Sequence, residues 1–215
     1  MTKKYILFDL DGTISNSAKG VLNGVLYALE KMGIKEEYDN LFSFIGPPLF
    51  DEFKRRFNMT DDEANTAVKI YREYYTETGV YENCAYDGIA DVIKKLHDNG
   101  KILILATSKP EKYAKIIMDN YGFSQYFYFI GGASLTDKSR NHKDAVIEYC
   151  LSECKITNPD ECIMIGDREH DVNGAKKFGI ETIGVLYGYG TEEELLSNGA
   201  KYIEKTPDEI LKILL

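Results

Sequence analysis

The sequence predicts an α/β fold: a mostly parallel sheet of about five strands, covered by helices on both faces, with a helical insertion after the first strand. Short apolar runs alternate with amphipathic segments over most of the chain, and such alternation is typical of parallel sheets. The alternation is interrupted once, between residues 17 and 83, where the pattern is helical throughout. Polar and acidic residues follow several of the apolar runs directly, so the candidate functional residues stand at the ends of the predicted strands.

Five runs have the length and composition of buried strands. They are Tyr5–Phe8, Ile102–Ala106, Tyr126–Ile130, Cys162–Ile165 and Thr182–Val185. Four segments between them carry apolar residues at helical spacing. These are Ile89–His97, Tyr113–Tyr121, Lys143–Leu151 and Val172–Phe178. Asn99-Gly100 follows the first of these helices as a stop signal.

The insertion divides the chain into two predicted domains, an α/β core made of residues 1–16 plus 84–215 and a helical domain of residues 17–83. Its predicted helices are Val21–Met32, Leu49–Phe57 and Asp61–Thr78. Thr60 is suited to cap the last of them. Gly46-Pro47-Pro48 predicts a rigid, exposed turn in the middle of this domain.

Composition limits the classes of partner. With 215 residues, 44% hydrophobic and 28% charged, the chain resembles an ordinary soluble globular protein. A formal net charge of -9 disfavours nucleic acid and anionic membranes as partners, although a few local cations could still bind a small phosphorylated metabolite. The first apolar run is too short for a signal peptide, and no run reaches membrane-spanning length. We therefore expect a cytoplasmic protein, either a monomer or a homodimer.

Asp9 and Asp11 are the most informative residues, because the strand Tyr5–Phe8 ends in these two carboxylates and Gly12. Asp is disfavoured in strands, and neighbouring carboxylates repel unless a cation or a shared proton relieves them. An Asx turn would account for these two residues alone. The arrangement predicts a divalent cation and anionic chemistry at the carboxyl end of the strand, where parallel sheets bind ligands.

The ends of the later strands carry further candidates. Thr107 and Ser108 stand before a helix, where hydroxyl and N–H groups suit an anion, although Thr107 by itself could be a helix cap. Asp167 follows the fourth strand, and Asp171 either turns towards the same site or caps the next helix.

Two cations precede or begin the helix after the third strand. Lys143 is assigned by position, with Lys138 or Lys109 as the alternatives. Arg140 could contact a substrate phosphate with two hydrogen bonds, or form a surface salt bridge instead.

These motifs together resemble the haloacid dehalogenase superfamily over the whole chain. Asp9-x-Asp11-Gly12-Thr13 is similar to its first motif and Gly166-Asp167-x-x-x-Asp171 to its fourth, with Thr107 as the second and Lys143 as the third. The resemblance implies a Rossmann-like core with a helical cap of the C1 type inserted after the first strand. It also implies a phosphatase, phosphoglycolate phosphatase-like or 5′-nucleotidase-like.

The resemblance implies a role for each motif residue. Asp9 would be the nucleophile, forming an aspartyl-phosphate, and a ligand of Mg²⁺. Asp11 would be the general acid and then the base, with its main-chain carbonyl on the metal. Asp167 would be the third metal ligand, and Asp171 a direct or outer-shell partner.

The remaining motif residues would bind phosphate. Thr107 and the Ser108 backbone would hold the transferring phosphoryl group, and Lys143 would neutralise Asp9 and the charge that develops in the transition state. Phe44–Leu49 resembles a cap loop that enters the active site, and its lack of charge predicts selection by shape.

Three alternatives remain open. The first concerns the substrate. The segment Gly131–Lys143 departs from the common phosphoglycolate phosphatase pattern, because Lys143 is followed by Asp144 where a Lys-Pro pair is usual, and it is similar to the 5′-nucleotidase-like group instead. Both aspartates also occur in phosphosugar mutases of the β-phosphoglucomutase kind, which differ mainly in the acceptor. A non-catalytic protein that binds a phosphorylated ligand is the third, disfavoured because every motif position is filled.

Overall fold

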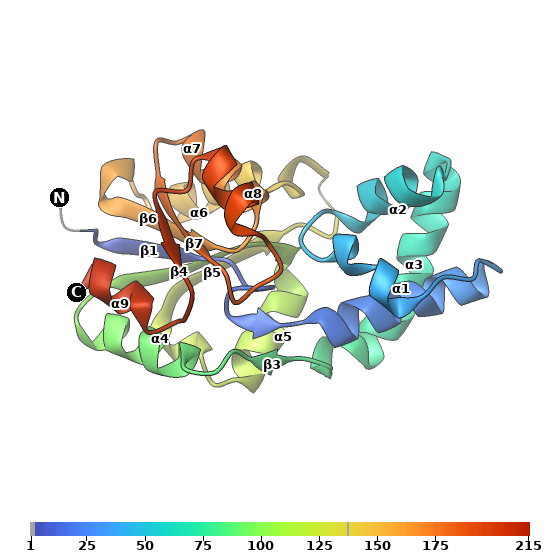
Figure 1. Cartoon of the computed structure of the whole chain (residues 1–215), viewed down its shortest axis with the longest axis horizontal. Helices are drawn as coiled ribbons and strands as arrows, with labels where there is room; N and C mark the ends of the chain where they lie inside the picture. Colours follow the sequence, from blue (N-terminus) through green and yellow to red (C-terminus); the bar gives the residue numbers. More distant parts are fainter. Residues whose placement is uncertain (1–2, 137) are drawn as a thin grey trace. The chain divides into compact units, whose positions relative to one another are not determined.

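The computed structural model describes residues 3–136 and 138–215. Its contacts divide the chain into two compact units: the chain up to Asn16 together with Ala85–Leu215, and Ser17–Cys84 (Figure 1). Two short strands, β2 (Ser15–Asn16) and β3 (Cys84–Ala85), stand where the chain passes from one unit to the other. Each unit is described separately.

The first unit is built on a parallel sheet with the strand order β5-β4-β1-β6-β7-β8. The strands are β1 (Tyr5–Phe8), β4 (Ile102–Pro110), β5 (Phe127–Ala133), β6 (Cys162–Gly166), β7 (Glu181–Val185) and β8 (Tyr202–Glu204). The predicted parallel α/β sheet is confirmed, with one strand more than the five expected. β8 was missed because three residues are too few to show a strand pattern.

Helices cover both faces of this sheet, as predicted. Figure 1 shows α6 (Lys143–Glu153), α7 (Glu169–Lys176) and α8 (Glu192–Asn198) on one side of it. On the other side lie α4 (Ile89–Asp98), α5 (Glu111–Asn120) and α9 (Glu209–Leu214). The central strands are therefore enclosed: Ile6, Leu7 and Phe8 of β1 are fully buried.

The strand order reverses beside β1. From β1 the chain continues to its neighbour β4 and outwards to β5, then returns to β6 on the other side of β1. Ligands of open parallel sheets bind at the carboxyl ends of the strands where the order reverses in this way. The residues that follow β1 and β6 therefore lie at the expected ligand site.

The second unit is helical: α1 (Ala18–Lys31), α2 (Leu49–Phe57) and α3 (Asp61–Glu77), with short 3₁₀ turns at Tyr38–Asn40, Phe42–Phe44 and Gly79–Tyr81. Thr60 caps α3 as predicted, accepting a hydrogen bond from the Glu63 N–H while the Glu63 side chain returns to the Thr60 N–H.

The predicted exposed turn at Gly46-Pro47-Pro48 is wrong in one respect, because these three residues are half-buried. The preceding residues Phe44 and Ile45 are buried, and the Phe44 ring lies 4.8 Å from that of Phe53 in α2. The turn therefore follows directly on two buried residues and is not fully exposed.

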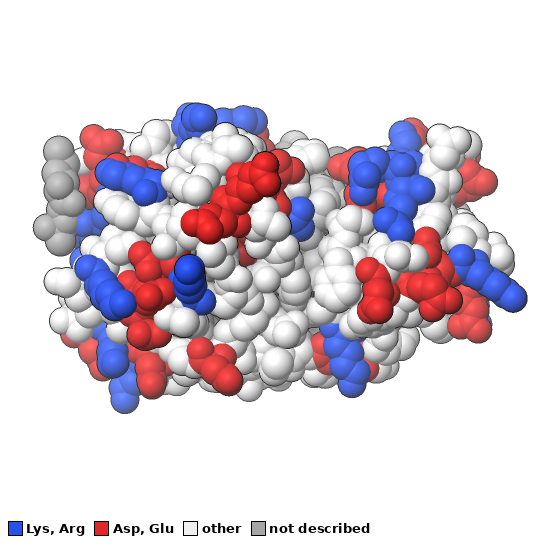
Figure 2. Space-filling model, viewed as in Figure 1, with Lys and Arg blue, Asp and Glu red and all other residues white. Residues whose placement is uncertain are grey.

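In the part of the chain that the structure describes, no helix combines the length and the hydrophobicity that crossing a membrane requires. On the face drawn in Figure 2, the basic and acidic side chains of the described residues are intermixed.

Candidate active site

Asp9 lies at the carboxyl end of β1, next to β6. Its backbone N–H donates to the Ile165 carbonyl at 2.9 Å, which continues the pairing of the two strands by one residue. Only 6% of Asp9 is exposed, and its Oδ1 lies 2.7 Å from Lys143 Nζ. A carboxylate is thus held in the interior by a lysine from α6.

Lys143 is the first residue of α6, and its ammonium group has three acceptors. Its Nζ lies 2.7 Å from Asp9 Oδ1 and 2.8 Å from Asp171 Oδ1, and it donates to the Ala106 carbonyl at 3.0 Å. An ammonium group carries three N–H donors, so this environment matches it fully. Burial opposes the charged form, but Asp171 and Asp9 outweigh it and raise the pKa of Lys143 above its ordinary value.

Asp167 follows β6 and is completely buried. Its Oδ2 accepts a hydrogen bond from the Tyr189 backbone N–H at 2.8 Å, and its Oδ1 lies 3.4 Å from the Thr13 hydroxyl. Burial, followed by the neighbouring charges of Asp171 and Asp9, raises the pKa of this carboxyl well above its ordinary value. A buried acid in this state is stabilised by any cation that binds beside it.

Asp171 combines the two roles that the sequence left open. It lies in the first turn of α7, where its Oδ2 accepts the Arg168 N–H at 3.1 Å as a helix cap does. Its Oδ1 faces Lys143 at 2.8 Å. Burial raises the pKa of Asp171 to about 6, with Lys143 acting in the opposite direction and Asp9 adding to the rise.

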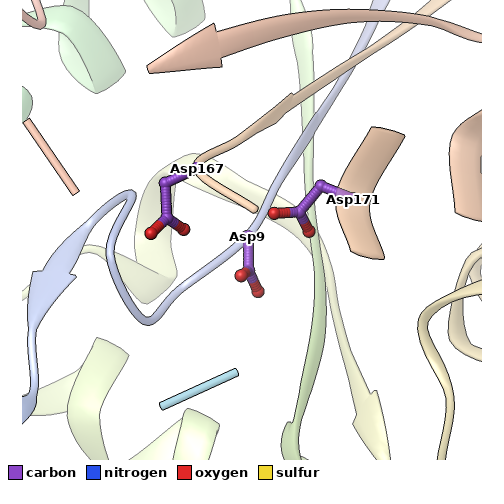
Figure 3. A group of neighbouring side chains, drawn as sticks. All are labelled: Asp9, Asp167 and Asp171. Atoms are coloured by element: carbon purple, nitrogen blue, oxygen red, sulfur yellow. The ribbon is translucent and has the colours of Figure 1, made fainter. Parts of the chain in front are cut away.

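Asp9, Asp167 and Asp171 form a buried group whose candidate ligand atoms all lie within 4.8 Å of one another. Figure 3 shows the three carboxylates brought together from the ends of β1 and β6 and from α7. Carboxylate oxygens are hard ligands of the kind that divalent cations such as Mg²⁺ prefer. Counting Asp11, the site holds four buried aspartates, three of which contact its two buried lysines, so the charges of this site also fit a divalent cation.

Two of the three predicted phosphate-binding residues, Thr107 and Ser108, lie near the end of β4. Thr107 is buried, and its hydroxyl accepts the Lys109 backbone N–H at 3.2 Å, while Ser108 is half-buried. Thr107 follows Ala106, whose carbonyl is a partner of Lys143. Thr107 and Ser108 therefore lie one and two positions after the residue whose carbonyl binds Lys143.

Arg140 has partners of its own in the structure. Its guanidinium lies 3.6 Å from Glu111 and 3.9 Å from the centre of the Tyr149 ring. It is half-buried and is not part of the aspartate group. The side chain of Lys138, an alternative to Lys143, lies outside the described part of the structure.

Two features of the site were missed by the sequence analysis. Lys109, considered only as an alternative to Lys143, is buried and places its Nζ 3.1 Å from Asp11 Oδ2. The loop after β7 reaches Asp167 through the Tyr189 N–H. A Cβ on Gly188 would lie 2.5 Å from Asp167 Cβ, and one on Gly190 would lie 1.9 Å from the Asp167 carbonyl oxygen. The two glycines at the end of a parallel strand were the available signal.

A comparison with protein families agrees with the fold. The model for haloacid dehalogenase-like hydrolases matches residues 6–185. The chain belongs to this family, and proteins named as phosphatases are among the relatives and solved structures that it matches.

Curated relatives cover nearly the whole chain. A 5′-nucleotidase of Pseudomonas aeruginosa is 41% identical over 191 residues, 88% of this chain and 86% of that protein. The tyrosine-protein kinase PtkA of Mycobacterium tuberculosis is 35% identical over 96% of this chain and 67% of its own length. A phosphoglycolate phosphatase of Vibrio vulnificus is 25% identical over 99% of this chain and 96% of that protein.

Solved structures agree with the fold. A crystal structure of a predicted phosphatase from Clostridium acetobutylicum matches with a TM-score of 0.95 at 41% identity, covering 100% of this chain and 99% of that one. The structure of PtkA from Mycobacterium tuberculosis matches with a TM-score of 0.84 at 34% identity, covering 99% and 98%.

Proposed function

We propose that this protein is a Mg²⁺-dependent phosphatase that hydrolyses small phosphomonoesters through an aspartyl-phosphate on Asp9. The observation that carries the proposal is the buried group of Asp9, Asp167 and Asp171 with Lys143 shared between two of its members. A nucleophilic carboxylate, metal-binding carboxylates and a fixed cation are what phosphoryl transfer to an aspartate needs. Membership of the hydrolase family supports it.

In the first half of the reaction, an Asp9 carboxylate oxygen attacks phosphorus while the bond from phosphorus to the ester oxygen breaks. The departing alcohol takes its proton from the Asp11 carboxyl. Lys143, 2.7 Å from Asp9, reduces the repulsion between this carboxylate and the phosphate dianion. Thr107 and the Ser108 backbone hold the phosphoryl oxygens.

In the second half, water attacks the same phosphorus and the bond to Asp9 breaks. Asp11, now a carboxylate, takes the proton of the water, so inorganic phosphate leaves and the enzyme returns to its starting state. Asp11 thus serves as acid and then as base, and both halves require its carboxyl group to lie beside the reacting oxygen.

Asp9 and Asp167 would hold Mg²⁺ through their carboxylates, with the Asp11 carbonyl as a further ligand and Asp171 adjacent. When bound, the ion supplies positive charge to the phosphoryl oxygens. The Asp171 carboxylate belongs to the same buried group, so it can serve either on the ion directly or through a water.

Nucleoside 5′-monophosphates are the proposed substrates, because the 41% identical relative is named a 5′-nucleotidase. Phosphoglycolate is the second choice, supported by a relative of 25% identity. In both compounds the phosphate is esterified to a primary alcohol, so the same general acid serves either one.

The test is phosphate release from a panel of esters with and without Mg²⁺, on the wild type and on Asp9→Asn. The panel contains nucleoside monophosphates, phosphoglycolate, hexose phosphates and pyrophosphate. We expect metal-dependent release that falls by about a thousandfold or more in Asp9→Asn, because the nucleophile is lost. Equal release by both proteins would contradict the proposal, and isomerisation of a sugar phosphate without release would favour a mutase.

Transfer to a tyrosine is a second candidate, favoured by the 35% identity to a tyrosine-protein kinase over 96% of this chain. The two functions differ in the donor and the acceptor of the phosphoryl group. Incubation with ATP followed by detection of phosphotyrosine separates them. A signal that survives in Asp9→Asn would indicate a route that does not use the aspartyl-phosphate.

A further inference from the structure

Lys109 is a buried cation that the proposed reaction does not use. Its Nζ lies 3.1 Å from Asp11 Oδ2, and its side chain is 5% exposed against 10% for that of Asp11. Lys143 has different partners, Asp9, Asp171 and the Ala106 carbonyl. The site therefore contains two lysines with separate targets, one at the proposed nucleophile and one at the proposed general acid.

The backbone of β4 is shaped so that Lys109 can reach this position. In the pairing with β5, Thr107 stands opposite Gly132 and Pro110 opposite Ala133, so Ser108 and Lys109 have no counterpart. Such a bulge changes the direction of a side chain at the end of a strand. The Thr107 hydroxyl accepts a hydrogen bond from the Lys109 N–H at 3.2 Å, and this bond stabilises the bulge.

Gly132 makes room for the bulge on the neighbouring strand. A Cβ at this position would lie 2.6 Å from the Lys109 carbonyl oxygen and 2.7 Å from Glu111 Cα, distances that no side chain can occupy. The Lys109 backbone can therefore occupy its position only because residue 132 is a glycine.

The Asp11 carboxyl group is held at one oxygen only. Oδ2 faces Lys109, whereas Oδ1 is buried and accepts no hydrogen bond from the described residues. A buried polar atom without a partner is rare and needs an explanation. An acid that must exchange a proton with the substrate requires one oxygen fixed and the other available.

We infer that Lys109 is a positioning residue for Asp11: it fixes Oδ2 and so presents Oδ1 to the oxygen of the leaving alcohol and then to water. This inference rests on the proposed phosphatase function. Lys109 does not exchange a proton with the substrate itself, and it acts only through the carboxyl group of Asp11.

The test compares esters whose leaving groups differ in their need for an acid. Ethyl phosphate needs protonation of its alkoxide, whereas the nitrophenolate of p-nitrophenyl phosphate leaves unaided. In Lys109→Met we expect kcat/KM for ethyl phosphate to fall on the order of 100-fold, the effect of misplacing a catalytic group. For p-nitrophenyl phosphate we expect a decrease of about threefold or less, because general-acid help contributes little there.

The parameter kcat/KM is informative because it reports the steps up to formation of the aspartyl-phosphate, in which the leaving group departs. Lys109→Arg retains a cation and should recover part of the loss on ethyl phosphate. Lys112→Met, an exposed lysine three residues along the chain, should match the wild type on both esters. In an Asp11→Asn background, Lys109→Met should cause almost no further loss, because both changes remove the same function.

Other outcomes would overturn the inference. Equal losses on ethyl and p-nitrophenyl phosphate would mean that Lys109 does not act through the general acid. A larger loss on phosphoglycolate than on ethyl phosphate would mean that Lys109 binds the charged leaving group.

A crystal structure of Lys109→Met tests the inference without any activity. We expect the Asp11 carboxylate to leave its position while Asp9 and Asp167 keep theirs. An unmoved Asp11 would overturn the positioning role. If the wild type hydrolyses no ester, the proposed function fails by itself, and this structure still decides whether Lys109 fixes Asp11.

Discussion

At the scale of single residues, the two buried lysines explain how several aspartates can share one interior site. Lys143 contacts Asp9 and Asp171, and Lys109 contacts Asp11. Each aspartate would be expensive to bury alone, because a charge removed from water needs a partner. The acids and the lysines therefore stabilise one another, and removing one of them should destabilise the buried charges that remain.

Lys143→Met should destabilise the protein by about 3–5 kcal/mol, because it leaves two buried carboxylates without their shared cation. Urea denaturation of the metal-free protein measures this effect. The matched control is Lys177→Met, which breaks an ion pair with Asp144 in which the lysine side chain is 63% exposed. That change should alter the free energy of unfolding by no more than about 1 kcal/mol. Similar losses in both variants would contradict our view of the site.

At the scale of elements, close contacts with glycines set the positions of the loop after β7 and of helix α1. The loop reaches Asp167 because Gly188 and Gly190 have no side chains: Cβ atoms there would lie 2.3 Å from the Gly12 carbonyl oxygen and 1.9 Å from that of Asp167. In this way a backbone N–H is delivered to a buried carboxylate.

Gly188→Ala should displace this loop and remove the hydrogen bond from the Tyr189 N–H to Asp167. Because Asp167 is a proposed Mg²⁺ ligand, loss of this supporting contact should raise the Mg²⁺ concentration for half-maximal activity by about tenfold or more. Tyr189→Phe is the control, because it retains the backbone N–H and loses only the hydroxyl that donates to Asn16. An unchanged Mg²⁺ dependence in Gly188→Ala would show that this hydrogen bond does not support the site.

Helix α1 contains a matched pair of glycines one turn apart. A Cβ on Gly20 would lie 2.0 Å from the Gly79 carbonyl oxygen, whereas one on Gly24 would meet the Tyr71 ring at 2.7 Å. Backbone atoms cannot move aside as a side chain can, so Gly20→Ala should destabilise by about 1–3 kcal/mol. Both variants gain the better helix propensity of alanine, worth up to about 1 kcal/mol, but in Gly24→Ala the Tyr71 ring can shift and relieve part of the strain. Urea denaturation should therefore rank Gly20→Ala as the more damaging change.

The elements also show what the sequence could and could not predict. β1 and α2 have the predicted bounds because their apolar patterns end at clear signals, a carboxylate in one case and a left-handed Asn58 in the other. β4 was predicted to end at Ala106 but continues to Pro110. Its last residues are polar and include the bulge, which depends on pairing with β5 and leaves no local pattern.

The same limit applies to the site. Asp9, Asp11 and Asp167 follow strands whose pattern is strong, so their common location could be inferred from the order of the strands. The target of Lys109 could not, because its direction depends on the bulge in β4 and on the space that Gly132 leaves. Contacts between residues distant in the chain determine both.

At the scale of the whole molecule, the proposed metal site would link metal binding to stability. In the native chain, candidate ligand atoms of Asp9, Asp167 and Asp171 lie within 4.8 Å of one another, and the unfolded chain does not hold them together. A ligand that binds only the native state stabilises it by mass action. With Mg²⁺ at a hundred times its dissociation constant, we expect the melting temperature to rise by about 5–10 °C over that in EDTA. Sodium chloride at the same ionic strength should give a much smaller rise.

Asp167→Asn should have opposite effects on the melting temperature without and with Mg²⁺. In EDTA the variant should melt at or above the wild-type temperature, because a fully buried acid beside two others is replaced by a neutral amide that can still accept the Tyr189 N–H. In Mg²⁺ it should lose most of the stabilisation, because the amide is a poorer ligand. Asp98→Asn, at an acid that is 57% exposed, should follow the wild type in both conditions. A Mg²⁺ shift that persists in Asp167→Asn would place the ion elsewhere, whereas its loss together with greater metal-free stability would mean that this acid is retained for binding at the expense of stability.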